Sequence, residues 1–423
     1  MRNFPKFVQV SLALALTVLP TFSSLADSQV LSDTSTTVYP FEIGPGVDNL
    51  SLGDQFAVYQ WAFKNDGNLQ LVSMINKFPQ LEANIGTTPD SESGSIRTPE
   101  KIGPGAYEPI TTNAVAGIDI NIKPAWQLYD AAQNKRHVTV AIIDTGIDIN
   151  HPELQGSLWV NPGEIPGDGI DNDGNGFIDD VNGWNFYDNN NSLYTGTLDY
   201  HGTHAAGTIA AVRGSFGIAG ITDNLFVKIM PVKALGGETG QGSTENVIKA
   251  IQYAEANGAD ICNLSFGASV TDPKLEEVMK NSRMLFVVAA GNGDPLGVGY
   301  DIDKSPIYPA ALPYDNIISV ANIMFDGNLS PDSNFGVGSV DLAAPGSYIV
   351  STTPGDTYAF MSGTSMAAPM VTGVAAMLYS YRPDISLLDV KNIILNSVKK
   401  LDSLNGKVAS GGMLDAGAAL SYQ

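Results

Sequence analysis

The sequence predicts an α/β protein with three layers, in which a mostly parallel sheet is flanked by helices. Two observations lead to this prediction. Continuous apolar, β-branched runs recur from residue 138 onward, and segments with helical periodicity separate them. Such runs are typical of strands buried on both faces, as in parallel sheets, and parallel strands need helical crossovers between them. The ligand-binding crevice of such a sheet lies at the carboxyl ends of its strands.

The expected elements follow in order along the chain. Strands are expected at 138–143, 225–232, 261–264, 284–289 and 317–320. Helices are expected at 124–129, 203–212, 243–257, 273–282, 365–378, 386–398 and 415–420. Gly258 follows the third of these helices, where glycine commonly ends a helix.

The length and the net charge of the chain exclude some classes of function. The chain has 423 residues, 43% of them hydrophobic, which is enough for a large core. Acidic residues number 44 against 22 basic ones, giving a net charge of −22. We therefore expect no nucleic-acid partner and no attraction to anionic membranes. No internal apolar run is long enough to span a bilayer, so we also expect no stable membrane insertion.

The N-terminus has the features of a secretory signal peptide. Arg2 and Lys6 accompany an apolar run over residues 7–19, and small residues occur at the cleavage positions before Ala26. We expect residues 1–26 to be removed and the protein to be secreted, either extracellular or periplasmic. With Cys262 as the only cysteine, no intrachain disulfide can form, and bound metal is a candidate for stabilisation.

Two polar residues follow buried strands at the predicted crevice. Asp144 ends the strand at 138–143, where its carboxylate can accept a hydrogen bond from an imidazole or, alternatively, cap the turn. Asn292 follows the strand at 284–289, where its amide can donate to a developing oxyanion. Loop asparagines are common, so this second signal is weak on its own.

Two of the four histidines, His201 and His204, stand at the start of a predicted helix. An imidazole there can serve as a general base near neutral pH. The physics of the sequence does not decide which ring does so. Metal ligation by the pair is an alternative, but the segment lacks the glutamate of the zinc-binding helix pattern.

Ser365 lies in the segment 362–369, where a glycine-hinged turn leads into the first turn of a helix. A serine there faces the positive end of the helix dipole and has its own N–H available as a donor. Both features favour a nucleophile whose attack creates an oxyanion. The alternative is a helix start built of small residues for close packing.

Together these motifs resemble those of the subtilisin-like serine proteases, the subtilases of peptidase family S8. The resemblance runs from about residue 117 to the C-terminus, and the order Asp, His, Ser matches that family. It implies a subtilisin-like catalytic domain over 116–423. It also implies Ser365 as nucleophile, His201 as general base oriented by Asp144, and His204 as a buried structural residue. Asn292 and the Ser365 N–H would form the oxyanion hole.

The resemblance also implies a substrate groove and a reaction. The segment Ser265, Phe266 and Gly267 would pair with an extended peptide, and Gly240 and Gly242 would form the opposite wall. The expected function is a secreted serine endopeptidase that acts as a monomer on proteins and peptides. The alternatives are a catalytically silent calcium-binding or adhesion protein on the same fold, and a maturation protease for one partner, with Phe266 and the loop 296–303 shaping its selectivity.

An acidic loop over residues 168–180 predicts a Ca²⁺ site. Oxygen side chains alternate, a glycine permits a sharp turn, and a backbone carbonyl can then join them, which suits a hard cation. The expected ligands are Asp171, Asp173, Asn175, the carbonyl of Phe177 and Asp179, with Asp180 as the alternative to Asp179. The loop departs from an EF-hand because its twelfth position is Asn182. The alternative is a solvated acidic turn.

Two further expectations come from the resemblance. Residues 27–115 are either a divergent propeptide or an N-terminal extension that stays attached. A second calcium site at Glu153 is not expected, because the facing loop 213–217 offers only the side-chain oxygen of Ser215.

Overall fold

A computed structural model describes residues 9–10, 41–43, 52–71, 112–196, 199–214, 217–237, 240–294 and 297–423. The predicted signal peptide over 1–26 lies outside these residues except for positions 9–10. Most of the segment 27–115 also lies outside them.

A nine-stranded sheet forms the centre of the molecule, with strand order β15-β16-β12-β11-β10-β9-β5-β7-β6. All its neighbouring strands are parallel except the pair β15 and β16. The prediction of a mostly parallel sheet is therefore confirmed. Its strands are β5 (Val138–Asp144), β6 (Trp184–Asn185), β7 (Val227–Lys233), β9 (Ile261–Leu264), β10 (Leu285–Ala289), β11 (Ile317–Ile323), β12 (Leu342–Pro345), β15 (Lys399–Lys400) and β16 (Gly412–Met413).

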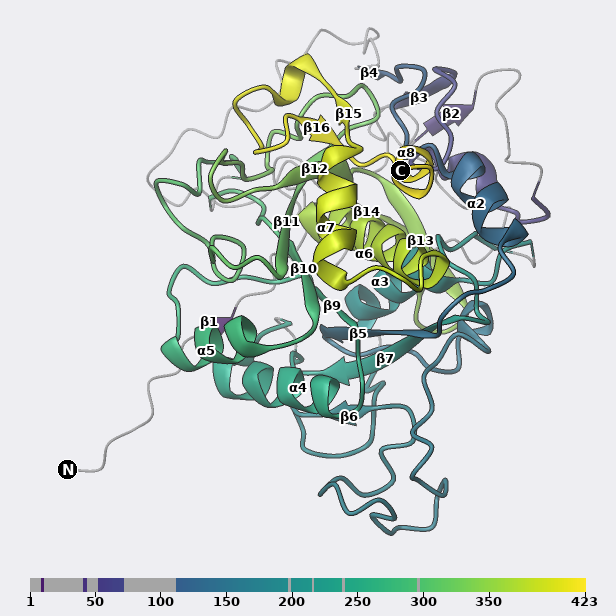
Figure 1. Cartoon of the computed structure of the whole chain (residues 1–423), viewed down its shortest axis with the longest axis vertical. Helices are drawn as coiled ribbons and strands as arrows, with labels where there is room; N and C mark the ends of the chain where they lie inside the picture. Colours follow the sequence, from purple (N-terminus) through teal and green to yellow (C-terminus); the bar gives the residue numbers. More distant parts are fainter. Residues whose placement is uncertain are drawn as a thin grey trace, which may run out of the picture.

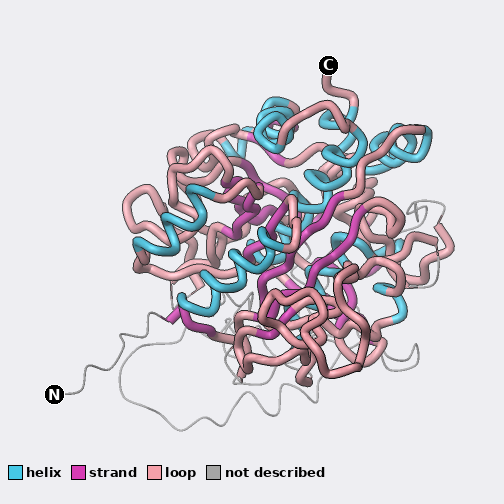
Figure 2. The backbone as a smooth tube through the Cα atoms, turned by 60° about the horizontal axis from the view of Figure 1, so that its bottom comes forward, coloured by secondary structure: helices cyan, strands magenta, loops and turns pink. Residues whose placement is uncertain are grey.

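Helices cover both faces of this sheet, with α4 and α5 on one side and α3 and α6 on the other (Figure 1). The tube in Figure 2 shows the strands running through the middle of the molecule. The helices are α2 (Ile122–Ala131), α3 (Tyr200–Ala210), α4 (Thr244–Ala256), α5 (Pro273–Asn281), α6 (Thr364–Tyr381), α7 (Leu387–Asn396) and α8 (Ala416–Leu420). None of the described helices combines the length and apolar character needed to cross a bilayer.

The strand order changes direction at β5. The next long strand along the chain, β7, pairs on one side of β5, and β9 pairs on the other. Crossovers that leave in opposite directions open a crevice at the carboxyl end of the strand between them. Asp144, the last residue of β5, lies at this position.

Helix α6 is buried along almost its whole length and packs against β9, β10, β11 and β12. This explains its composition, since a helix that is apolar on all sides is stable only inside a core. Gly373 allows the close approach, because a Cβ there would lie 2.8 Å from Cβ of Ile221. The packing holds the first turn of α6, which carries Ser365, against the sheet.

A hairpin that the sequence analysis did not predict covers α3. Its strands are β13 (Ile349–Thr353) and β14 (Thr357–Met361), paired antiparallel. The two elements pack closely because Gly207 has no side chain: a Cβ there would lie 2.6 Å from Oγ of Ser351 and closer still to Oγ1 of Thr352. Ser351 Oγ donates to the carbonyl of His204 at 2.7 Å.

The N-terminal segment 52–69 belongs to the same hydrophobic core as the sheet. Trp61 and Leu69 are buried, and the Trp61 indole N–H donates to the carbonyl of Ser347 at 2.9 Å. The Gln60 side chain donates to the carbonyl of Ala219 and accepts from its N–H. The segment includes a 3₁₀ turn, η1 (Ala57–Tyr59), and leads to a small sheet of β2 (Phe41–Ile43), β3 (Leu69–Leu71) and β4 (Thr112–Asn113).

Another short pairing lies away from the main sheet. Strand β8 (Gly242–Ser243) pairs antiparallel with β1 (Gln9–Val10). Two further 3₁₀ turns, η3 (Pro152–Leu154) and η5 (Asp402–Leu404), complete the described elements.

Candidate functional site

Asp144 and His201 form a buried carboxylate–imidazole pair. Nδ1 of His201 lies 2.9 Å and 3.0 Å from the two carboxylate oxygens of Asp144, and both residues are almost wholly buried. An ionised carboxylate can only accept hydrogen bonds, so Nδ1 carries the proton of the neutral ring and Nε2 carries the lone pair. Nε2 is buried and has no hydrogen-bond partner among the described residues. This nitrogen is the basic atom of the site.

The pair forms because the first turn of α3 lies directly against the end of β5. A Cβ at Gly202 would lie 3.2 Å from Cβ of Asp144 and would overlap the carbonyl oxygen of Gly146. The Gly202 N–H donates to Thr145 Oγ1 at 3.3 Å, and the Asp148 N–H donates to Thr203 Oγ1 at 3.0 Å. Glycine after the histidine is therefore a steric requirement of this contact.

Ser365 is the second residue of α6 and is buried. Gly363, the residue before the helix, has φ of +143°, which a side chain would disfavour. Ser365 Oγ donates to the carbonyl of Ser265 at 3.1 Å, and Ser265 Oγ donates to the carbonyl of Ser365 at the same distance. The structure thus places the serine at the end of β9, on a helix that packs against α3, without a hydrogen bond to His201 Nε2.

Asn292 lies beside the residue that precedes Ser365. Its Oδ1 accepts hydrogen bonds from the N–H and the hydroxyl of Thr364, both at 2.8 Å. These bonds fix the amide plane, with the oxygen toward Thr364 and the amino end on the opposite side. An amide oriented in this way can donate through Nδ2.

His204 is buried, and its ring contacts backbone carbonyl groups instead of Asp144 or Ser365. Its Nε2 lies 2.9 Å from the carbonyl of Ile349 and 3.2 Å from that of Ala359. Because both partners are acceptors, Nε2 must donate. Burial lowers the pKa of His204 to about 3, and the backbone hydrogen bonds oppose this only in part. The ring therefore stays neutral and ties α3 to the hairpin of β13 and β14.

Of the predicted substrate-groove residues, Ser265 directly follows β9 and contacts Ser365. A Cβ at Gly267 would lie 2.7 Å from Ile307, and Ala268 forms an antiparallel bridge with Tyr308. Phe266 is only 1% exposed, because its side chain packs in the core. Only the main chain of Phe266 is therefore available for contact, and the part of this residue in selectivity stays a prediction.

Gly240 and Gly242 are the residues expected to form the opposite wall of the groove. Gly240 has φ of +61°, and Gly242 lies in β8. A side chain at Gly242 would meet the carbonyl oxygen of Ala234. These two positions therefore offer only main chain.

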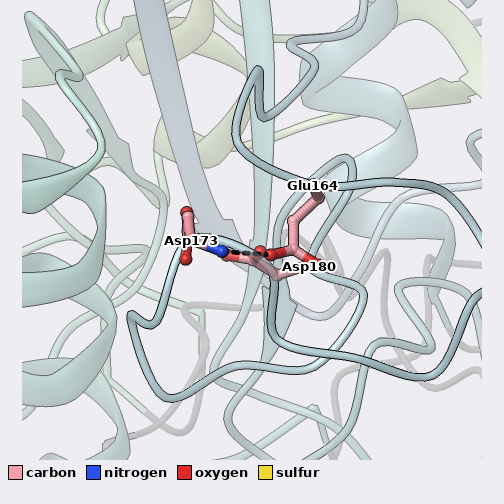
Figure 3. A group of neighbouring side chains, drawn as sticks. All are labelled: Glu164, Asp173 and Asp180. Carbon is pink, nitrogen blue, oxygen red and sulfur yellow. Dashed lines mark hydrogen bonds between the residues drawn. The ribbon is translucent and has the colours of Figure 1, made fainter.

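Three carboxylates gather in the acidic loop: Glu164, Asp173 and Asp180 (Figure 3). Each offers an oxygen, and these oxygens lie within 4.8 Å of one another. Asn161 Nδ2 bridges Asp173 and Asp180 at 3.0 Å and 2.9 Å, and Asn175 Nδ2 bridges the same two carboxylates at 3.1 Å and 3.0 Å.

This cluster differs from the expected ligand set. Asp179 has φ of +53°, and its carboxylate accepts from the N–H groups of Gly167 and Gly169 at 2.8 Å and 2.9 Å, away from the cluster. Asp180 takes the place expected for Asp179. Asp171 also lies outside the cluster, since it accepts from the N–H groups of Asn175 and Gly176.

Asn175 and Phe177 make further contacts next to the cluster, and their service as Ca²⁺ ligands, through the Asn175 side chain and the Phe177 carbonyl, stays a prediction. Asn175 presents its amino group to the carboxylates, and its Oδ1 accepts from the Phe177 N–H at 2.8 Å. The Phe177 ring packs against Trp184, Phe186 and Tyr253.

The sequence analysis missed Glu164. This residue precedes the alternating oxygen pattern, and its Oε1 accepts from the N–H groups of Asn172 and Asp173 at 2.8 Å and 3.2 Å. Its Oε2 accepts from Asp179 N–H at 3.1 Å. Its position, seven residues before Asp171, is the sequence signal that could have identified it as a further carboxylate of the acidic loop.

Asp180 is a buried carboxylate whose pKa is shifted by its surroundings. Burial raises the pKa of Asp180, and the charge of Asp173 adds to the rise. Hydrogen bonds from Tyr253, Asn161 and Asn175 act in the opposite direction. The Tyr253 hydroxyl on α4 donates to Asp180 Oδ2 at 2.6 Å. A nearby cation would relieve this electrostatic cost.

The carboxylate of Glu153 accepts hydrogen bonds from groups of the protein itself. Its Oε1 accepts from the N–H groups of Gly217 and Ile218 at 2.7 Å and 3.0 Å, and from the Tyr358 hydroxyl at 3.0 Å. The Ser215 named in the sequence analysis lies outside the described residues.

Comparison with known proteins places the chain in a family. Residues 135–412 match the profile of the subtilase family, and the chain belongs to that family. It is 34% identical over 307 residues to thermitase of Thermoactinomyces vulgaris, covering 72% of this chain and 94% of thermitase. It is 35% identical over 300 residues to Subtilisin-like protease 1 of Plasmodium falciparum (isolate 3D7), covering 67% of this chain but only 43% of that relative.

A solved structure is also similar. The crystal structure of a cold adapted subtilisin-like serine proteinase matches with a TM-score of 0.51 and 25% sequence identity, covering 67% of this chain and 91% of that one. The predicted subtilisin-like fold is thus confirmed.

The close contact of α3 with β5 leads to a first prediction. In Gly202→Ala, the new methyl would meet the Gly146 carbonyl and push His201 away from Asp144. We expect kcat for peptide hydrolysis to fall by about 10²-fold, since a displacement of about 1 Å at a catalytic group has that effect. Gly53→Ala is the control, because its Cβ would meet nothing nearer than 3.5 Å. Unchanged kcat in Gly202→Ala would contradict the geometry described here.

A second prediction concerns His204 and pH. The folded protein binds no proton at His204 until about pH 3, whereas the unfolded chain binds one near pH 6.5. The free energy of unfolding should therefore fall as pH drops below about 6.5, and His204 should contribute about 1.4 kcal/mol per pH unit to that fall. In denaturant titrations at pH 7 and pH 5, the free energy of unfolding should fall less in His204→Gln than in the wild type. The difference in pH slope should correspond to the uptake of about one proton on unfolding. Equal pH slopes in both proteins would contradict this account.

Proposed function

We propose that this protein is a serine endopeptidase that hydrolyses peptide bonds through an acyl-enzyme on Ser365. The observation that carries the proposal is the buried Asp144–His201 hydrogen bond at the carboxyl end of the central strand. It leaves a basic nitrogen inside the crevice, while α6 holds a serine at its N-terminus nearby. The family and its relatives named as serine proteases support the same reading.

The reaction begins with the Ser365 hydroxyl. A rotation about χ1 moves Oγ from the Ser265 carbonyl toward His201 Nε2, which accepts the proton as Oγ attacks the substrate carbonyl carbon. Apo enzymes often show such catalytic bonds unformed. Asp144 stays ionised, holds the Nδ1–H and stabilises the imidazolium.

The second half of the reaction reverses the proton transfer. Asn292 Nδ2 and the Ser365 N–H donate to the oxyanion of the tetrahedral intermediate. Collapse of the intermediate breaks the C–N bond, and His201 gives its proton to the departing amine. Water then repeats the sequence on the acyl-enzyme and releases Ser365.

The substrate lies as an extended strand in this proposal. The main chain of Ser265 to Gly267 forms one edge, and Gly240 to Gly242 forms the other. Glycine stands at 240, 242 and 267, and the Phe266 side chain is buried, which supports action on many protein segments instead of one dedicated partner.

We also propose export of the protein. The apolar N-terminal run predicts it, and we infer that the enzyme is extracellular or periplasmic and monomeric. Residues 52–69 stay with the mature enzyme, because removing Trp61 and Leu69 would open the core. Any propeptide within 27–115 therefore excludes that segment.

Calcium binding fits the acidic loop. Glu164, Asp173 and Asp180 are hard oxygen donors grouped without nitrogen or sulfur ligands from histidine or cysteine. The raised pKa of the buried Asp180 is the independent sign that a positive charge would be favourable there. Bound Ca²⁺ would neutralise these charges and hold the loop in place, and we propose these residues as its carboxylate ligands.

A third prediction tests the nucleophile. A fluorophosphonate probe should label Ser365, and Ser365→Ala should remain unlabelled with kcat reduced about 10⁶-fold. Ser421→Ala, at the exposed C-terminal end, is the matched control and should label normally. Absence of labelling in the wild-type protein would instead favour a catalytically silent member of the family.

A fourth prediction tests the calcium ligands. Chelation should lower the melting temperature at neutral pH, and this effect should disappear as pH falls, because protonated Asp180 cannot ligate. Since the pKa of Asp180 is raised, the loss begins at higher pH than for an ordinary aspartate. In Tyr253→Phe, which removes a hydrogen bond that lowers this pKa, the loss should begin at still higher pH.

Paired variants separate Asp180 from its neighbour. Asp180→Asn should abolish the difference in melting temperature between calcium and chelator. Asp179→Asn should retain it, since Asp179 only caps the turn at 167–169. A calcium response that survives in Asp180→Asn would rule out the proposed ligand set.

A further inference from the structure

Lys233, the last residue of β7, is a buried cation. Its side chain is 1% exposed, and that of its partner Asp199 is 2% exposed. Lysine is almost never fully buried unless it is paired. Here Nζ donates to Asp199 Oδ1 at 2.7 Å and also to the carbonyl oxygen of Thr145.

The two partners of Lys233 flank the Asp144–His201 pair in the sequence. Thr145 directly follows Asp144, and Asp199 precedes His201 by two residues. Strand pairing sets Lys233 beside Asp144 in register. A single ammonium group therefore contacts the segment that carries the carboxylate and the segment that carries the imidazole.

Further hydrogen bonds fix Asp199 and Asp144 in these two segments. The second oxygen of Asp199 accepts from the N–H and the hydroxyl of Thr195 at 2.5 Å and 3.1 Å. The carbonyl of Asp144 accepts from the N–H groups of Ala234 and Leu235 at 3.0 Å and 3.1 Å. The last residue of β7 and the two residues after it thus hold the carbonyl groups of Asp144 and Thr145.

We propose that Lys233 is a positioning residue that sets the placement of His201 relative to Asp144 by joining Thr145 to Asp199. This inference rests on the proposed peptidase function. Lys233 does not touch substrate; it acts through the segments that carry the two reacting side chains.

The alternative is that the buried pair only stabilises the fold. Buried ion pairs are poor stabilisers, because desolvation of the two charges offsets their attraction, and neutral replacements of both partners often fold as well. A neutral pair would nevertheless lose the charged donor to the Thr145 carbonyl. Stability and catalysis should therefore respond differently when both charges are removed together.

The experiment compares Lys233→Met with the double variant Lys233→Met/Asp199→Asn. Active sites are counted by fluorophosphonate titration, so that kcat refers only to folded, reactive molecules, and melting temperature is measured alongside. Lys228→Met is the matched control. Lys228 lies on the same strand at the opposite end, where its ammonium contacts the Asn224 carbonyl at 2.7 Å.

Lys233→Met should lower both the melting temperature and kcat per active site, because it leaves a buried carboxylate uncompensated. The double variant should recover most of the melting temperature but keep a kcat about 10- to 100-fold below the wild type. KM should stay within about twofold, since the groove segments at β8 and β9 keep their contacts. Lys228→Met should match the wild type in kcat.

Two results would overturn the positioning role while leaving the proposed function intact. One is a kcat per active site in Lys233→Met equal to that of the wild type. The other is a double variant that regains wild-type kcat along with its melting temperature, since the pair would then be purely structural. A wild-type protein that does not react with the fluorophosphonate would overturn the peptidase function itself, and the positioning role with it.

Discussion

The contact between the first turn of α3 and the end of β5 is the constraint on which the rest of the site depends. Asp144 and His201 can share a hydrogen bond only because Gly202 lets the helix reach the loop that follows the strand. The contact is wholly buried, and its polar groups have partners in the protein, except Nε2 of His201, which has none among the described residues. Lys233, Thr145 and the first turn of α3 supply these partners.

The acidic loop is linked to the contact between α3 and β5 only through other elements. Asp180 is tied to α4 through Tyr253, and Phe177 packs on Trp184 at the start of β6. Strand β6 pairs with the end of β7, where Asn185 lies opposite Lys233. A bound ion would therefore act on His201 through β6 and β7, although the loop stands between Asp144 and His201 in the sequence.

Prediction from the sequence succeeded where one local pattern determines the outcome. The apolar, β-branched run at 138–143 predicts a buried strand, and this places Asp144 at its carboxyl end, beside the crevice. Prediction failed where a side chain could turn in either of two directions. Asp179 and Asp180 are adjacent and chemically identical, and the positive φ of Asp179 decided which carboxylate joins the cluster. Phe266 likewise turned into the core, which no local pattern indicated.

The sequence by itself determined the α/β class, the alternation of strands and helices over residues 138–320, and the residue types able to carry acyl-transfer chemistry. These follow from periodicity and from short motifs, which are local properties of the chain. Tertiary structure alone decided that residues 52–69 join the core, that Glu164 completes the acidic cluster, and that Lys233 bridges Thr145 and Asp199. Each of these contacts joins segments separated along the chain, and only packing in three dimensions determines which distant groups meet.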